Sequence, residues 1–247
     1  MKYLNEYITL HEKNQDYGAS SIKYFDEVCV IIDFLKPKTV LDYGMGKGAL
    51  LKLLLRRYPD VKFYGYDPAI KGHDVLPIAK ADLVINTDVL EHIPEEELPE
   101  VINQISKISQ NAFFVLNHAL AKTILPNGEN AHCTVKPPIW YYNLFSKFFK
   151  TPYPLKSRGI ELSAMITFSP TVPFLRNYNK AINPPQKVAN PTQKVTNPPQ
   201  KEFLKQKILP YGLGKFITLF ILKKENRLHF MKKHVKEAVS HKGIIIK

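Results

Sequence analysis

The feature that most constrains the fold is a short apolar run that ends in a carboxylate and a cluster of glycines. Residues 39–43 read Thr-Val-Leu-Asp-Tyr, and Gly-Met-Gly-Lys-Gly and a leucine-rich segment over 49–58 follow. A buried strand, a glycine turn and a helix in this order bring backbone N–H groups and a helix N-terminus close to a ligand. The pattern therefore predicts a βαβ unit with a ligand site at the end of its first strand.

Further apolar segments continue the same alternation. We predict strands over 61–66, 81–86 and 111–117, and helices over 4–13, 20–35, 95–108 and 139–149. Strands that alternate with helices imply right-handed crossovers and a parallel sheet that is covered by helices on both faces. Only thirteen residues separate Asp67 from Ala81, so one helix of the alternation is expected to be reduced to a loop.

The end of the sheet is expected to differ from its start. Segments 151–157 and 160–169 are predicted to form an antiparallel hairpin, turned at Arg158-Gly159, that closes the domain near residue 170. The predicted fold class is therefore α/β, a doubly wound and mostly parallel sheet with an antiparallel closing hairpin and a basic C-terminal extension.

Charge divides the chain into unlike parts. Residues 1–170 carry 19 basic and 19 acidic side chains, whereas residues 171–247 carry 16 and 3 and so hold the whole net charge of +13. Residues 183–201 contain three copies of a proline-rich heptapeptide, and such a segment lacks the apolar groups needed for a core. We predict a globular domain over 1–170, a repeat linker over 171–202 and a basic, partly helical extension over 203–247.

Composition narrows the class of protein. Hydrophobic residues make up 45% of the chain and charged residues 23%, which is usual for a globular protein. Two cysteines, Cys29 and Cys133, suffice neither for a disulfide framework nor for a cysteine-based zinc site, and we expect no metal site. No apolar run approaches the ~20 residues of a membrane span, and the first residues lack the apolar core of a signal peptide. These features predict a cytoplasmic protein.

Carboxylates follow the predicted strands. Asp42, Asp67 and Asp88 come at strand ends, with Glu91 close behind, and the carboxyl ends of parallel strands meet at one edge of a sheet. The glycine spacing over 44–48 is G-x-G-x-G, which differs from the G-x-G-x-x-G fingerprint of dinucleotide-binding proteins. A carboxylate cluster repels a pyrophosphate and suits a cation. S-adenosylmethionine carries a sulfonium and an ammonium against one carboxylate, so the charges favour it over NAD.

Three motifs in this order resemble those of the class I S-adenosylmethionine-dependent methyltransferases. They are Val40–Gly48, then Tyr66-Asp67-Pro68, then Asp82–Val84 with Asp88–Pro94. The resemblance covers roughly residues 15–170 and implies a Rossmann-like fold that uses S-adenosylmethionine and releases S-adenosylhomocysteine. The cofactor-binding residues that it implies are Tyr17, Gly18, Asp42, Gly44, Gly46, Gly48, Asp67, Asp74, Asp88 and Val89.

The resemblance also assigns parts to individual residues. The glycine turn packs against the methionine moiety, Asp42 holds the amino group, and Asp67 accepts hydrogen bonds from both ribose hydroxyls. Asp88 lines the cofactor pocket, and the Tyr17-Gly18 segment closes over the cofactor. Asp74 is a candidate for the adenine amino group, with an ordinary loop carboxylate as the alternative.

A hydroxyl acceptor needs a base for its proton, and histidine is the usual one near neutral pH. The catalytic candidates are His92 after the third strand, His118 after the fourth, and His132 in the excursion over residues 125–140. His92 could equally serve a structural or cofactor-pocket role. We expect His11 to be solvated.

The acceptor pocket is predicted to contain Lys136, Trp140 and Tyr141. Aromatic rings beside a lysine suit a sugar or a phosphorylated or nucleotide-linked metabolite, although Trp140 could simply anchor its helix on the sheet. The excursion resembles that of methyltransferases encoded in bacterial cell-surface polysaccharide clusters, including those for O-methyl sugar or phosphoramidate decorations. The resemblance implies an O-methyltransferase of a small polar acceptor.

Two other functions compete with this prediction. A nucleic-acid methyltransferase would explain the basic tail, but the neutral body lacks a track for phosphates, and the Asn-Pro-Pro triplets are followed by glutamine rather than by an aromatic residue that could stack on a base. A non-enzymatic adaptor would use the basic amphipathic segment over 215–236 on anionic membranes. The intact glycine and acidic positions favour an enzyme, with which peripheral membrane contact of the tail is compatible.

Overall fold

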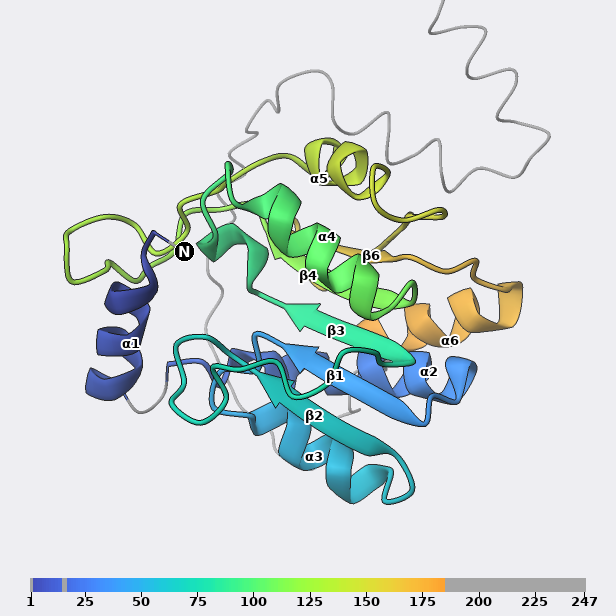
Figure 1. Cartoon of the computed structure of the whole chain (residues 1–247). Coiled ribbons are helices and arrows are strands. Elements are labelled where there is room, and N and C mark those ends of the chain that lie inside the picture. The colour runs from blue at the N-terminus through green and yellow to red at the C-terminus, as the bar shows by residue number, and fades with distance from the viewer. Residues whose placement is uncertain (1, 15–16, 185–247) are drawn as a thin grey trace, which may run out of the picture. The chain divides into compact units, whose positions relative to one another are not determined.

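The computed structural model describes residues 2–14 and 17–184 (Figure 1). The described residues fall in the first of two units, Met1–Val188. The predicted repeats beyond residue 184 and the basic extension lie outside the described residues. In the part of the chain that is described, no helix is long and apolar enough to cross a membrane.

A six-stranded sheet forms the centre of the domain. Its strands are β1 (Thr39–Tyr43), β2 (Lys62–Tyr66), β3 (Leu83–Thr87), β4 (Ala112–Asn117), β5 (Tyr153–Leu155) and β6 (Leu162–Ile166). They lie in the order β2-β1-β3-β4-β6-β5, and β1 to β4 are parallel, whereas β6 runs antiparallel to both β4 and β5. The predicted α/β fold with an antiparallel closing hairpin is confirmed. Residues 67–82 contain no helix, as the short spacing predicted.

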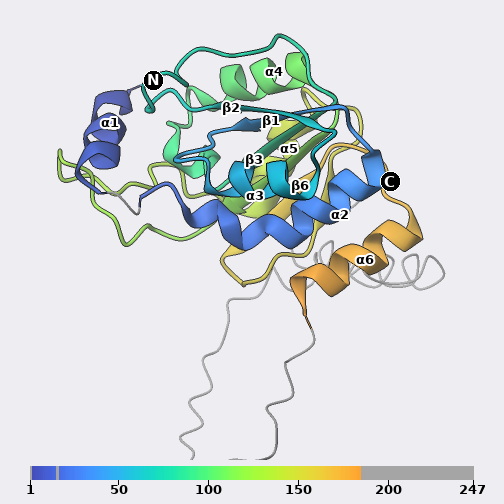
Figure 2. The same ribbon diagram turned by 90° about the horizontal axis from the view of Figure 1, so that it is seen from below.

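Helices cover both faces of the sheet. α2 (Phe25–Leu35), α3 (Ala49–Arg57) and α6 (Val172–Ile182) pack on one face, and α4 (Leu98–Ile108) and α5 (Pro138–Phe145) on the other (Figure 2). All five residues of β3 are buried, because a central parallel strand has a helix layer on each side. On the second face the rings of Phe114 in β4 and Phe145 in α5 stack with centroids 4.4 Å apart.

The folded domain extends beyond residue 170, so the predicted boundary at that residue is wrong. Thr171 caps α6 by accepting a hydrogen bond from the backbone N–H of Phe174 (3.4 Å). Phe174, Tyr178 and Ile182 recur every four residues and are buried in the core cluster that contains α2. Residues 171–182, which the charge boundary assigned to the linker, therefore belong to the globular domain.

The carboxyl edge of the sheet is covered by a further layer. α1 (Leu4–Lys13) and the loop over 118–134 lie beyond the ends to which the arrows of β1 and β3 point (Figure 1). Tyr3 and Tyr7 of this layer form a small cluster with Leu125 and Ala131 of the loop. The short helices η1 (Ser20–Tyr24) and η2 (Leu90–His92) begin at the same edge. This layer encloses the space in which the strand-end residues meet.

Candidate active site

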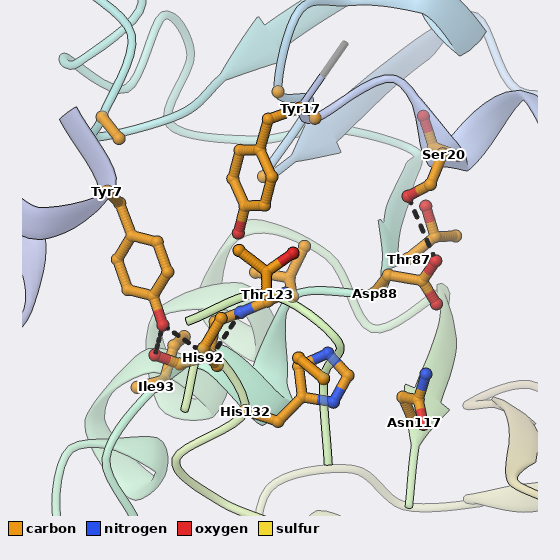
Figure 3. A pocket seen from close by; sticks show the side chains of 18 of the residues that line it. Tyr7, Tyr17, Ser20, Thr87, Asp88, His92, Ile93, Asn117, Thr123 and His132 are labelled. Atoms are coloured by element: carbon orange, nitrogen blue, oxygen red, sulfur yellow. Dashed lines mark hydrogen bonds between the residues drawn. The ribbon is translucent and has the colours of Figure 1, made fainter. Parts of the chain in front are cut away.

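A cavity of about 550 Å³ lies at the carboxyl edge of the sheet. Its wall is built from the turn after β1, the ends of β2 and β3, α1, and the loop that follows β4 (Figure 3). Among the predicted cofactor residues, those that line it are Tyr17, Gly18, Gly44, Gly46, Asp67, Asp88 and Val89. The structure thus brings together residues that are up to 72 positions apart in the chain.

The glycine turn needs its glycines for two separate reasons. Gly44 (φ +86°) and Gly46 (φ +54°) have left-handed backbone conformations, which side chains other than glycine rarely adopt. A Cβ atom on Gly46 would also lie 2.3 Å from the carbonyl oxygen of Gly18, which accepts a hydrogen bond from Lys47 N (3.1 Å). Gly48 lies at the start of α3 and does not line the cavity. The turn and the Tyr17-Gly18 segment therefore form one packed wall.

Asp67 joins the end of β2 to this wall. One carboxylate oxygen accepts a hydrogen bond from Gly46 N (2.9 Å) and the other from Ala69 N (2.9 Å). Asp67 is 8% exposed and lines the cavity. Each oxygen keeps a second lone pair, so the carboxylate can hold the turn and still accept ligand hydroxyls.

Asp42 is a buried carboxyl group in β1 with no hydrogen-bond partner among the described residues. It is 1% exposed, and burial, with a smaller contribution from Asp67, raises its pKa to about 7. It lies behind the wall rather than in it. An unpaired carboxylate beside a glycine turn is a fitting counter-charge for an ammonium group.

Asp88 is held in place by the segment before α2. Its oxygens accept hydrogen bonds from Tyr24 Oη (2.7 Å) and Ser20 Oγ (3.4 Å; Figure 3) and pair with Lys23 Nζ (2.7 Å). Its φ of +54° is rare outside glycine. These contacts fasten η1 to the end of β3 and fix one side of the cavity.

Asp74, a predicted adenine contact, does not line the cavity. It is exposed and accepts a hydrogen bond from Gly72 N (3.1 Å) within its own loop. This is the ordinary loop carboxylate that the alternative interpretation described.

The predicted acceptor residues do not line the cavity either. Tyr141 is fully buried in the core, where its hydroxyl donates to the carbonyl oxygen of Thr134 (3.1 Å). Lys136 pairs with Glu95 (2.5 Å) and lies 5.6 Å from the ring centroid of Trp140, which packs against the core. These residues lie outside the cavity because α5 turns its aromatic residues onto the sheet, and the loop before α5 lines the cavity instead.

Of the three predicted catalytic histidines, His118 forms hydrogen bonds outside the cavity. Its Nδ1 lies 2.6 Å from the carbonyl oxygen of Lys136 and its Nε2 2.7 Å from Ser163 Oγ. Both nitrogens have partners and the ring does not line the cavity. His118 therefore ties the end of β4 to β6 and to the segment before α5, which is a structural part.

His92 and His132 do line the cavity, and they lie against each other. Their ring centroids are 4.8 Å apart at an interplanar angle of 77°. His92 Nδ1 lies 2.7 Å from the carbonyl oxygen of Ala131, and His132 Nδ1 lies 2.6 Å from that of Ala119. A carbonyl oxygen only accepts, so both Nδ1 atoms carry the proton and both Nε2 atoms keep their lone pair. Burial lowers the pKa of His92 to about 4, which keeps it neutral at pH 7.

α1 contributes to the cavity wall, which the sequence patterns did not predict. Leu4, Tyr7 and His11 recur at helical spacing and line the cavity, so the prediction that His11 is solvated is wrong. The His11 ring packs edge-on against Tyr17 with centroids 4.9 Å apart, and burial lowers its pKa. The i, i+3, i+7 pattern could have revealed this face.

Comparison with known proteins relates part of the chain to a known family. Residues 22–137 match the family model described as methyltransferase domain. This segment, just under half of the chain, is therefore similar to methyltransferase domains. It runs from η1 through β4 and the loop that carries His132, and so contains most of the cavity wall. A comparison with curated proteins found no match.

Solved structures similar to this chain are distant in sequence. A putative O-methyltransferase from Nostoc punctiforme is 12% identical (TM-score 0.47), with 66% of this chain and 60% of that chain covered. Human N-acetylserotonin methyltransferase, solved with S-adenosylmethionine, is 20% identical (TM-score 0.44; 60% and 52% covered). The plantazolicin methyltransferase BpumL, solved with S-adenosylhomocysteine, is 13% identical (TM-score 0.47; 66% and 89% covered). The chain thus spans about 60% of the length of the Nostoc protein.

The match to a methyltransferase family model makes S-adenosylmethionine the cofactor to consider, and the residues present fit it. Asp42 offers an unpaired negative charge for the ammonium group, and Asp67 offers free lone pairs for the ribose hydroxyls. Gly44 and Gly46 line the cavity without side chains, so a ligand can approach the backbone of the turn. These three features lie within one stretch of the cavity wall and directly behind it.

Proposed function

We propose that this chain transfers a methyl group from S-adenosylmethionine to an oxygen atom of a small polar acceptor. The observation that carries the proposal is that one cavity contains both the glycine turn with Asp67 and the histidine pair His92 and His132. The first group suits the cofactor, and the second suits an acceptor that loses a proton.

The bound cofactor supplies an electrophilic methyl group, which the acceptor oxygen takes while the carbon–sulfur bond breaks and S-adenosylhomocysteine is left. The chain contributes position and a path for the proton. Asp67 and the glycine turn hold the cofactor at one wall. His92 and His132 line the cavity, and their Nε2 lone pairs would take the hydroxyl proton of the acceptor.

The polarity of the wall supports a hydroxylated acceptor. Beside His132, the residues that line the cavity include Asn117, Lys122, Thr123 and Glu161. Amide, ammonium, hydroxyl and carboxylate groups together provide donors and acceptors of hydrogen bonds without a large net charge. A sugar or a nucleotide-linked or phosphoramidate-type metabolite fits this mixture, and the resemblance of the loop around His132 points to cell-surface polysaccharide precursors.

The proposal is tested with the full chain, S-adenosylmethionine and a panel of sugars, nucleotide sugars and phosphoramidates. Mass spectrometry should reveal one acceptor class that gains a methylene unit, and hydrolysis of the product should place the new group on oxygen. Oligonucleotides belong in the same panel, since a methylated nucleic acid would replace this proposal by the alternative. If no acceptor class is methylated, or if the methyl group is found on nitrogen, the proposal fails.

Cofactor binding is tested separately with Asp67→Ala. Removing a carboxylate that holds Gly46 N and faces the cavity should weaken binding of S-adenosylhomocysteine about tenfold or more, since hydrogen bonds to charged groups contribute ~1.5–3 kcal/mol each. Asp74→Ala, which removes an exposed carboxylate outside the cavity, is the matched control and should bind as the wild type does. Equal affinities of the two variants by isothermal titration calorimetry would remove Asp67 from the cofactor site.

A further inference from the structure

Glu91, His92 and His132 form a cluster of possible metal ligands. The two histidines line the cavity, whereas Glu91 is fully buried and lies outside its lining. Glu91 and His92 come from η2 directly after β3, and His132 comes from the loop over 118–134. One carboxylate oxygen and one nitrogen of each ring lie within 4.8 Å of one another. Side chains that are forty residues apart in the chain therefore converge on one point.

The two rings are held in the orientation that metal-binding histidines usually have. A ligating histidine commonly donates its other ring N–H to a carbonyl or carboxylate oxygen, which fixes its tautomer. Here both Nδ1 atoms donate to backbone carbonyl oxygens, of Ala131 (2.7 Å) and Ala119 (2.6 Å). The Ala131 oxygen also accepts a hydrogen bond from Tyr7 Oη (2.8 Å), so α1 supports the arrangement.

The loop that carries His132 is itself closed by hydrogen bonds. Asn130 exchanges two of them with the backbone of Ala121, at 2.9 Å and 2.8 Å, and its Oδ1 also accepts from His132 N (2.9 Å). A ligand on a loop fastened at this point needs little ordering when an ion binds.

Glu91 provides an independent observation. Its side chain is fully buried, and neither carboxylate oxygen has a hydrogen-bond partner within the described part of the chain. A buried carboxyl group without a partner is costly in its charged form, and a cation between it and the two imidazoles would complement that charge. Glu91 is thus an unsatisfied acceptor beside two lone pairs.

The donor set indicates which ions fit. Two imidazole nitrogens and one carboxylate suit zinc and other divalent transition metals, whereas magnesium and calcium prefer oxygen ligands. Bonds of about 2.0–2.2 Å require ligand atoms roughly 3–3.5 Å apart. The three ligand atoms would have to approach one another by about 1–2 Å, which is within the reach of side-chain rotation.

We propose that Glu91, His92 and His132 bind one divalent transition-metal ion, of which zinc and manganese are the best candidates, with an open coordination position toward the cavity. The site departs from the expectation that the chain has no metal site. As a step that rests on the proposed function, the open position takes the acceptor hydroxyl. Coordination lowers the pKa of such a hydroxyl, so its proton can leave to solvent before the oxygen bonds to the methyl carbon, and His92 and His132 serve as ligands rather than as bases.

The binding test uses the full chain stripped of metal with EDTA and titrated with Zn²⁺, Mn²⁺ and Mg²⁺ by calorimetry. We expect the wild type to bind one Zn²⁺ or Mn²⁺ per chain. The affinity for the ion should fall about 100-fold or more in His132→Gln and in Glu91→Gln, because each substitution removes one of the three ligands. His73→Ala is the control, since His73 is an exposed histidine outside the cluster. An affinity for the ion that is unchanged in His73→Ala would show that this surface histidine does not contribute to the measured binding.

A second readout identifies the ligands directly. X-ray absorption at the zinc edge should report nitrogen and oxygen ligands with at least two imidazoles in the wild type and fewer in His132→Gln. If His132→Gln does not fold by circular dichroism, Glu91→Gln gives the same comparison with a side chain of nearly the same volume. No metal binding by the stripped wild type, or equal affinity in wild type and both ligand variants, overturns the site.

Methyl transfer separates this inference from the proposed function. Metal binding that depends on the three ligands, without transfer to any acceptor, leaves the site in place and defeats the proposed function. Transfer that is undiminished after metal removal defeats the catalytic part of the metal and leaves the proposed function in place. Loss of activity on stripping, with recovery on adding Zn²⁺ or Mn²⁺, supports both.

Discussion

Two fully buried carboxyl groups, Asp42 and Glu91, lack a hydrogen-bond partner among residues 2–14 and 17–184. Burial of an unpaired charge is costly, so such a group is either protonated or complemented by a cation. Both lie at the carboxyl edge of the sheet, Asp42 beside the glycine turn and Glu91 beside the histidine pair. The positively charged cofactor would complement Asp42, and a metal ion would complement Glu91.

Asp42→Asn should make the stability of the protein less dependent on pH. The pKa of Asp42 is about 7 in the folded protein against an ordinary 3.8, so the folded state holds a proton that the unfolded state has lost between these values. Wild-type stability therefore falls as pH rises from about 4 to 7, by ~4 kcal/mol at most, since one pKa unit corresponds to about 1.36 kcal/mol. Asparagine removes this fall.

The measurement is urea unfolding of wild type and Asp42→Asn between pH 4 and pH 8. The advantage of the variant should be small at pH 4 and largest above pH 7, while its affinity for S-adenosylhomocysteine falls because a neutral amide attracts an ammonium less. Asp74→Asn, an exposed carboxylate, should follow the wild type. Parallel stability curves for wild type and Asp42→Asn would show that Asp42 is not protonated in the fold.

At the scale of elements, the β1–α3 connection and the Tyr17-Gly18 segment act as one wall. A Cβ atom on Gly46 would lie 2.3 Å from the carbonyl oxygen of Gly18. Asp67 at the end of β2 accepts a hydrogen bond from Gly46 N. Three separate parts of the chain thus meet at one backbone position. The cofactor side of the cavity depends on this contact.

Gly46→Ala should therefore be more harmful than glycine-to-alanine substitution at another left-handed position. Gly128 has φ +87° and open space around it, so Gly128→Ala should cost only backbone strain, about 1–2 kcal/mol. Gly46→Ala adds a clash with a backbone oxygen and should also weaken binding of S-adenosylhomocysteine at least tenfold. Urea unfolding and calorimetry measure both effects, and equal losses in the two variants would contradict this account of the wall.

At the scale of the whole chain, α6 decides where the folded domain ends. Its residues Phe174 and Tyr178 are each 2% exposed, and its contacts are with α2. Arg158, before β6, pairs with the buried Glu27 of α2 (2.9 Å) and donates to the carbonyl oxygen of Ala181 (2.9 Å). α6 is thus fastened to the domain by both apolar and charged contacts.

Two truncations test this boundary. A chain of residues 1–188 should unfold cooperatively and bind S-adenosylhomocysteine with the affinity of the full chain. A chain of residues 1–170 should lose roughly 5–9 kcal/mol from three buried side chains at ~1.5–3 kcal/mol each, which approaches the whole stability of a typical domain. Circular dichroism melts and calorimetry compare the two, and similar melts would show that α6 is dispensable.

Sequence patterns predicted the parts of this protein that depend on neighbouring residues. The apolar runs of β1 to β4, the glycine turn and the placement of Asp42, Asp67 and Asp88 at strand ends follow from local periodicity and from the rule that parallel strands end at one edge. The short link after Asp67 excluded a helix by length alone. The antiparallel hairpin at the end of the sheet was predicted in the same way.

Only the tertiary structure decided which histidines reach the cavity. His118 turns toward Ser163 and away from it, whereas His11 and His132 reach it from a helix and a loop that meet only in the folded chain. A ring's direction depends on hydrogen bonds to distant backbone atoms, such as the Ala131 oxygen for His92, and no local pattern encodes those. The packing of α6 also depended on the tertiary structure, because an amphipathic helix packs on whichever apolar surface the other elements leave exposed.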